Sequence, residues 1–209
     1  MDAQTPSRPQ VAVLGGINGA GKTTASQRIL RDALKIPVFT NADAIARGLN
    51  AFDPESEAVK AGRIMLEHLG SLAAARKSFA FETTLAARTY ARRLGELKRD
   101  GYAVHLFYYW LESADMAINR VADRVKSGGH FVPDATIRRR YSRSVRNFLE
   151  LYRPLVTTWQ VFDNSRGGSR LIAFHNGYFD TVIDDDRWEL FNRSADDDGA
   201  DDDAGGRPD

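Results

Sequence analysis

The chain has 209 residues, 43% of them hydrophobic and 27% charged, which is sufficient for one domain with a buried core. It contains no cysteine, and this excludes a disulfide framework, a cysteine-based metal site and a thiol nucleophile. No apolar run approaches the roughly 18–20 residues that cross a bilayer, and the polar start MDAQTPSRPQ is unlike a signal peptide. We therefore expect a cytoplasmic protein with no membrane partner.

The net charge of +1 hides an uneven distribution of charge along the chain. Residues 194–209 (SADDDGADDDAGGRPD) carry seven Asp and one Arg and have no large apolar side chain, which predicts a disordered acidic tail. Residues 1–9 are expected to be a disordered leader. The body, residues 10–193, has a net charge of +7, and a basic body favours an anionic ligand such as a nucleotide or a nucleic acid.

The first predicted elements are a buried strand at residues 10–14, a glycine-rich loop and a helix at residues 22–34. The loop has P-loop spacing, Gly-x-x-x-x-Gly-Lys-Thr. Its glycines let backbone N–H groups surround phosphate oxygens, and the helix start adds the positive end of its dipole. Lys22 would bind the β and γ phosphates, and the Thr23 hydroxyl would be a ligand of Mg²⁺. The residues expected to bind ATP are Gly16, Asn18, Gly19, Ala20, Gly21, Lys22, Thr23 and Thr24.

A second strand is predicted at residues 37–43, with Asp43 at its end. Strand ends on the P-loop side of a parallel sheet face the ligand crevice. A carboxylate there can accept the proton of an attacking hydroxyl. An Asp N-cap of a helix at residues 44–49 explains the same residue without catalysis, so position alone leaves both interpretations open.

A long helix at residues 55–77 leads to a third strand at residues 78–84 (SFAFETT). Glu82 lies near the end of that strand. Its carboxylate could hold the Mg²⁺ shell through water, bind substrate hydroxyls or only cap the strand. Thr83 and Thr84 add hydroxyl groups beside it.

The rest of the body continues the alternation of helices and strands. Helices are predicted at residues 85–101, 112–129, 134–152 and 181–192, and strands at residues 102–111, 159–165 and 170–177, the last two joined by an RGGS turn. The pattern predicts an α/β fold: a P-loop kinase-type parallel sheet of about five strands flanked by helices, with a helical lid and a C-terminal hairpin. One kinase domain would span residues 10–193. The turn of residues 163–165, with Arg166, is a candidate for the adenine pocket.

Residues 119–141 are interpreted as the lid. Arg120 and Arg124 lie four residues apart on one helix face. Glycines at 128 and 129 permit a bend before the next helix, which carries arginines at 138–140. Closure would exclude water and place guanidinium groups from both helices, among them Arg120 and Arg124, on the transferring phosphoryl group. Solvated arginines on two surface helices are the plainer interpretation.

Five segments occur in a characteristic order: GGINGAGKTT, NADAIA, FETTL, RVADRVKSGGHFVP and RRRYSRSVRN. Together they resemble the zeta-toxin family of P-loop kinases, in its short single-domain form, over roughly residues 10–165. The P-loop alone is shared by many proteins, whereas the combination of NAD, FETTL and GGHFVP is far more specific.

The resemblance implies an enzyme that uses ATP and Mg²⁺ to phosphorylate a sugar hydroxyl of UDP-N-acetylglucosamine, and that a separate antitoxin protein restrains. It implies that Asp43 is the general base and that Lys22 and Thr23 hold ATP and Mg²⁺. Glu82 and Thr84 would meet the substrate, while Arg124 and one arginine of 138–140 would act on the phosphates. Among the lid arginines, Arg120, Arg124 and Arg140 are favoured for this role. The expected acceptor is therefore a small molecule, with a nucleotide sugar favoured.

Two other functions stay open. A polynucleotide or nucleoside kinase would use the same loop, base and lid, and the basic body supports it. No basic-aromatic nucleic-acid module is present in the sequence, however, so nucleic acid is not the expected partner. The other function is an ATP-controlled switch without kinase activity. The sequence lacks the Asn/Thr-Lys-x-Asp guanine element and the Leu-Ser-Gly-Gly transporter element.

Overall fold

The computed structural model describes residues 8–27, 29–30, 34–129 and 131–196. Within them a seven-stranded sheet has the order β2-β3-β1-β4-β5-β6-β7. The strands are β1 (Gln10–Gly16), β2 (Phe39–Asn41), β3 (Phe79–Thr83), β4 (Ala103–Trp110), β5 (Thr158–Asp163), β6 (Arg170–His175) and β7 (Asp180–Val182). The first five strands in spatial order are parallel, and β6 and β7 are antiparallel. The predicted α/β class, parallel sheet and C-terminal hairpin are confirmed.

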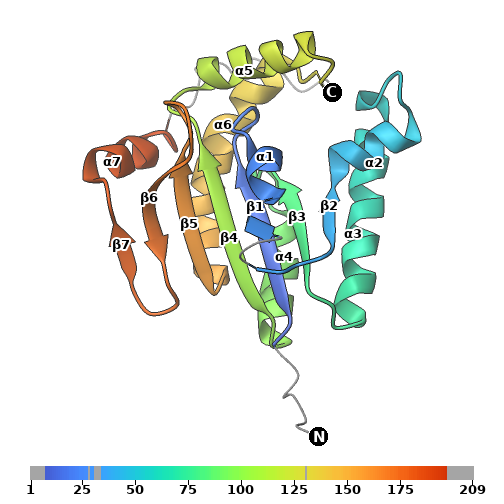
Figure 1. The fold of residues 1–209 in the computed structure, drawn as a ribbon, viewed down its shortest axis with the longest axis vertical. Helices are drawn as coiled ribbons and strands as arrows, with labels where there is room; N and C mark the ends of the chain where they lie inside the picture. The colour runs from blue at the N-terminus through green and yellow to red at the C-terminus, as the bar shows by residue number, and fades with distance from the viewer. Residues whose placement is uncertain (1–7, 28, 31–33, 130, 197–209) are drawn as a thin grey trace, which may run out of the picture.

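Helices lie on both sides of the sheet (Figure 1). They are α1 (Lys22–Gln27), α2 (Ala42–Leu49), α3 (Ala58–Ala74), α4 (Thr89–Arg99), α5 (Ala114–Lys126), α6 (Asp134–Asn147) and α7 (Asp185–Arg193). In Figure 1, α1 lies in front of the sheet and α4 and α6 lie behind it, while α5 crosses above the strand ends. In the described part of the chain, no helix combines the length and the apolar character needed to cross a membrane.

The central strand β1 is buried on both faces, and residues 11–14 (VAVL) are all fully buried. This is the pattern of a parallel strand covered by helices on each side. Strand β1 pairs with β3 on one side and β4 on the other. The carboxyl ends of these strands therefore meet at one edge, where the glycine-rich loop begins.

Two predicted elements need correction. Asp43 neither ends a strand nor caps a helix, because β2 ends at Asn41 and α2 begins at Ala42. The side chain of Asn41 is the cap and accepts hydrogen bonds from the backbone N–H groups of Asp43 and Ala44. The predicted helix at 181–192 is also wrong at its start, because residues 181–182 belong to β7 and α7 begins after its cap, Asp184.

The predicted leader and tail lie mostly outside the described residues, as do residues 28 and 31–33 of the helix predicted at 22–34. The described ends are packed on the domain. The Arg8 side chain donates to the carbonyls of Gly101 and Tyr102, and Ala195 is buried with its carbonyl accepting from Arg146. The folded domain thus includes a few residues beyond the predicted limits of 10 and 193.

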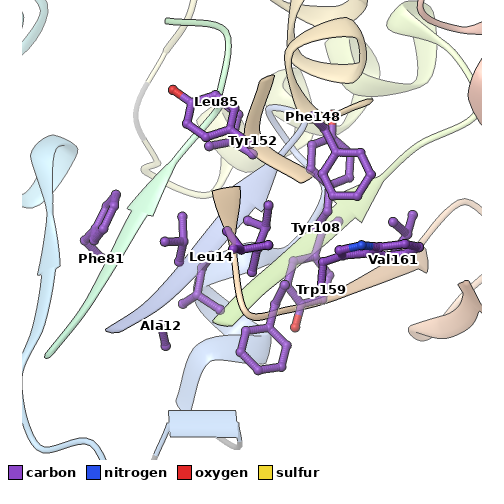
Figure 2. Close-up of a cluster of buried hydrophobic side chains, with 14 of the residues drawn as sticks. Ala12, Leu14, Phe81, Leu85, Tyr108, Phe148, Tyr152, Trp159 and Val161 are labelled. Carbon is purple, nitrogen blue, oxygen red and sulfur yellow. The ribbon is translucent and has the colours of Figure 1, made fainter. Parts of the chain in front are cut away.

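An aromatic cluster joins the C-terminal helices to the sheet. Phe148, in the π-helical turn η3 (Phe148–Tyr152), is fully buried. Its ring lies 4.8 Å from that of Tyr108 on β4, 5.8 Å from Trp159 on β5 and 5.6 Å from Phe191 on α7. Figure 2 shows the rings of Phe148, Tyr108 and Trp159 together on one side of the strands. Phe148 therefore connects two strands with the last helix.

We predict that Phe148→Ala lowers the free energy of unfolding by about 3–5 kcal/mol, because it removes a buried ring and leaves a cavity. Urea denaturation followed by tryptophan fluorescence measures the change. Phe52→Ala is the matched control, since Phe52 is fully exposed and its removal should change stability by less than about 0.5 kcal/mol. Equal effects of the two substitutions would contradict the assigned core.

Candidate active site

The loop between β1 and α1 is shaped by contact with the neighbouring strand β4. Gly16 has a φ of +125°, and a Cβ atom at this position would lie 2.1 Å from the carbonyl oxygen of Tyr109. The next residue, Ile17, donates its N–H to the same oxygen at 3.0 Å. Only glycine fits this conformation and this close approach, so the first glycine of the motif sets the direction of the loop.

Lys22, at the start of α1, is buried against the loop. Its Nζ donates hydrogen bonds to the carbonyls of Gly16 at 3.0 Å and Ile17 at 2.8 Å, and it lies 4.0 Å from Glu82 Oε1. Burial lowers the pKa of Lys22, and the negative charges of Glu82 and Asp43 oppose that shift. The ammonium group is thus fixed over the loop, where the sequence predicts the β and γ phosphates.

Three polar side chains meet beside this lysine. The Thr23 hydroxyl donates to Glu82 Oε2 at 2.8 Å, and Asn41 Nδ2 donates to the same oxygen at 3.1 Å. The strand register explains the meeting, because Glu82 on β3 lies opposite Leu14 on β1 and Asn41 on β2.

A hydroxyl and a carboxylate oxygen beside a phosphate loop are suitable for Mg²⁺, which binds few protein groups and takes its other ligands from phosphates and water. Within the described residues no cluster of three or more His, Asp or Glu side chains is arranged to hold a metal ion. The adjacent oxygens of Thr23 and Glu82 are the groups that would bind a magnesium ion together with a phosphate ligand.

A cavity of about 540 Å³ lies next to these groups, and most of the predicted catalytic residues line it. Its walls include Lys22, Asp43, Glu82, Thr84, Arg124 and Arg140. Of the residues predicted to bind the nucleotide, Asn18 and Gly19 also line it, whereas Thr24 is exposed on α1. Side chains from five separate segments of the sequence thus face one space.

The arginines of α5 and α6 divide into two groups. Arg139, Arg140 and Arg143 line the cavity together with Arg124. Arg138 is turned away and forms an exposed ion pair with Asp115 on α5. The structure therefore places Arg140, not Arg138, at the cavity.

Arg120 is not among the residues that line the cavity. Its Nη2 donates to the backbone carbonyls of Asn164 at 2.7 Å and Ser165 at 3.2 Å. The predicted contact between Arg120 and the transferring phosphoryl group remains a prediction, and in this structure its guanidinium binds the turn after β5.

Several lining residues were not predicted from the sequence: Asn41, Glu55, Tyr90 and Arg143. Two of them carried a usable signal. Asn41 immediately precedes a helix, as an N-cap does, and Arg143 follows Arg139 by one helical turn. Glu55, in the 3-10 turn before α3, and Tyr90, on α4, reach the cavity only through tertiary packing, which no local pattern reports.

Comparison with known proteins identifies the family of this chain. A family model described as "Zeta toxin" matches residues 1–169, about four fifths of the chain. The chain belongs to the zeta toxin family. A protein of Haemophilus influenzae described only as uncharacterized is 31% identical over 134 residues, which is 60% of this chain and 88% of that protein. Family membership confirms the predicted resemblance.

Solved structures of low sequence identity share the fold. The AvrRxo1-ORF1:-ORF2 structure with ATP has a TM-score of 0.71 at 14% identity, and the match covers 90% of this chain and 64% of that chain. The PezAT chromosomal toxin-antitoxin system of Streptococcus pneumoniae has a TM-score of 0.62 at 18% identity, covering 90% of this chain and 79% of that chain. The zeta toxin chain described here thus spans less than two thirds of the AvrRxo1 chain.

We predict that Gly16→Ala destabilises the protein and abolishes nucleotide binding, because a methyl group meets the Tyr109 carbonyl. The unfavourable backbone conformation alone costs about 1–3 kcal/mol, and urea denaturation with ADP titration measures both effects. Gly62→Ala is the control, since a Cβ there meets no atom within 4 Å and lies in the interior of α3. It should be neutral or stabilising by up to about 1 kcal/mol. Normal ADP affinity in Gly16→Ala would contradict the assigned loop geometry.

Proposed function

We propose that this zeta toxin family member is an ATP-dependent kinase that transfers the γ-phosphoryl group to a hydroxyl of a small molecule. Asp43 is the general base, and a nucleotide sugar such as UDP-N-acetylglucosamine is the favoured acceptor. The observation that carries the proposal is the shared cavity: a carboxylate on one wall faces a P-loop lysine and several arginines on the others. ATP is the proposed donor because the similar AvrRxo1 structure was solved with ATP.

The position of Asp43 supports its role in proton transfer. It lies in the first turn of α2, and its backbone N–H is fixed by Asn41 at 2.8 Å. As the acceptor oxygen bonds to the γ phosphorus and the bond from that phosphorus to the bridging oxygen of ADP breaks, the Asp43 carboxylate takes the hydroxyl proton. No covalent bond to the protein is needed.

The basic groups stabilise the charge that develops during transfer. Lys22 approaches from the P-loop, and Arg124 and Arg140 approach from α5 and α6. Fixed cations beside a transferring phosphoryl group stabilise the negative charge that develops on it. Thr23 and Glu82 would hold Mg²⁺, which supplies further positive charge to the phosphate oxygens when bound.

The acceptor class follows from the remaining wall of the cavity. Thr83 and Thr84 offer hydroxyl groups, and the Glu55 carboxylate can accept hydrogen bonds from hydroxyl groups of the substrate. Arg139 and Arg143 add two positive charges beyond those assigned to the transferring phosphate. A molecule with both sugar hydroxyls and its own phosphates fits this mixture, and a nucleotide sugar has both.

A separate antitoxin protein is the proposed partner. The support is the family assignment together with the similarity to a structure described as a toxin-antitoxin system.

Expression in a bacterial host tests whether the protein is toxic through its chemistry. Growth arrest by the wild type should be relieved by Asp43→Ala if phosphoryl transfer causes it. Equal toxicity of both forms would contradict a catalytic toxin.

We predict that Asp43→Ala and Asp43→Asn lower the rate of acceptor phosphorylation by about 10²–10⁴, the usual contribution of a general base. The assay uses labelled ATP with nucleotide sugars, nucleosides and short oligonucleotides as acceptors. Asp123→Asn is the control, since Asp123 is an exposed α5 carboxylate paired with Lys126. Undiminished transfer by Asp43→Asn would exclude its role as base, and preferential labelling of oligonucleotides would favour a polynucleotide kinase.

Arg140 and Arg138 provide a second test on one helix. Arg140→Ala should reduce the maximal rate by about 10²–10³, as expected for a group that stabilises the transition state. Arg138→Ala should leave the rate within about twofold, because it removes only an exposed ion pair. Steady-state kinetics compare the two variants, and the reverse order of effects would show that the cavity arginines are wrongly assigned.

A further inference from the structure

The turn that follows β5 is buried although its residues are polar. Asp163, Asn164 and Ser165 are each at most 9% exposed. Burial of consecutive polar groups is costly unless they find hydrogen-bond or ionic partners. The partners come from three distant parts of the chain, namely the P-loop, α5 and α7.

The side chain of Asn164 holds the P-loop directly. Its Nδ2 donates to the carbonyl oxygen of Ala20 at 2.6 Å, while its backbone N–H donates to Trp110 at the end of β4 at 2.9 Å. In a planar trans peptide, the carbonyl of Ala20 and the N–H of Gly21 point in opposite directions. A carbonyl fixed toward Asn164 therefore directs the Gly21 N–H away from Asn164, as a phosphate-binding loop requires.

Arg120 fastens the same turn to α5. Its guanidinium binds the carbonyls of Asn164 and Ser165. Its stem lies close to the loop, because a Cβ built on Gly19 would be 3.1 Å from the Cβ of Arg120. The turn and the P-loop are thus held together from the α5 side.

Arg187 of α7 fixes the turn from the other side. Its Nε lies 2.7 Å from Asp163 Oδ2, and its Nη1 donates to Glu112 at 3.0 Å. The guanidinium also lies over the ring of Trp110, 5.0 Å from its centre. Asp163 in turn accepts the Ser165 N–H at 2.9 Å, which closes the turn. Loss of Arg187 would leave a buried carboxylate without its counterion.

We propose that Asn164 is a positioning residue for the P-loop and that Arg187 acts through it by fixing the turn. Helix α7 lies beyond residue 169, where the family match ends. The C-terminal segment therefore contributes to the phosphate-binding site, although none of its residues lines the cavity. This inference rests on the proposed function only in taking the loop ligand to be a nucleotide.

The test measures ADP affinity by titration calorimetry, at a temperature where each variant is folded by circular dichroism. Asn164→Ala should weaken ADP binding by about tenfold, the effect of one lost hydrogen bond to a buried group. Arg187→Met should weaken it to a similar extent. Arg193→Met is the control on the same helix, since Arg193 is exposed and only pairs with Glu189; its ADP affinity should match that of the wild type.

A double variant separates positioning from general loosening of the fold. If Arg187 acts through Asn164, the double variant Asn164→Ala/Arg187→Met should bind ADP about as weakly as either single variant. Where acceptor phosphorylation is detected, the KM for ATP should rise in these variants while the KM for the acceptor stays unchanged. Asn164→Asp, which replaces the donor by an oxygen, should impair ADP binding at least as much as Asn164→Ala.

Unchanged ADP affinity in folded Asn164→Ala, additive effects in the double variant, or no ADP binding by the wild type would each overturn the inference. Failure of the proposed function gives a different result. In that case no acceptor is phosphorylated, yet ADP still binds the wild type and binds the Asn164 and Arg187 variants less tightly.

Discussion

The proposed chemistry depends on five parallel strands that end at one edge of the sheet. Backbone hydrogen bonding between strands fixes the register, so Glu82 must lie beside Asn41 and next to the strand that enters the P-loop. Residues more than forty positions apart in sequence are thereby brought within hydrogen-bonding distance, as Asn41 and Glu82 show at 3.1 Å. The helices then only need to add side chains around a site that the sheet has already placed.

The cavity is also an electrostatic arrangement. Burial of Lys22 disfavours its charged form and so lowers its pKa. The negative charges of the neighbouring carboxylates oppose that shift. Arginines from α5 and α6 add positive charge to the same cavity. A site with fixed charges of both signs can bind a polyphosphate on one side and leave a carboxylate beside an incoming hydroxyl on the other. The segment interpreted as a lid, residues 119–141, includes parts of both helices.

Features encoded locally could be predicted from the sequence. The glycine spacing, Lys22 and Thr23 specify the loop, and the apolar runs specify the parallel strands. Asp43 lines the cavity, but its local structure was predicted wrongly, because Asn41 is the N-cap and the helix starts earlier. Arg140 was favoured over Arg138 from the sequence without a structural reason, since the difference depends on which face of α6 packs on α5. The role of Arg187 was hidden for the same reason, because its partners are set by tertiary contacts.

The most direct test of the account is the amount of phosphorylated acceptor formed for each ADP produced. Radiolabelled ATP, a nucleotide-sugar acceptor and chromatographic separation of ADP, inorganic phosphate and product would give the ratio. A kinase with the active site described here should form one phosphorylated acceptor per ADP, release little inorganic phosphate and lose both products in Asp43→Asn. ADP and inorganic phosphate formed at the same rate with and without any acceptor would contradict phosphoryl transfer and indicate a nucleotide-controlled switch.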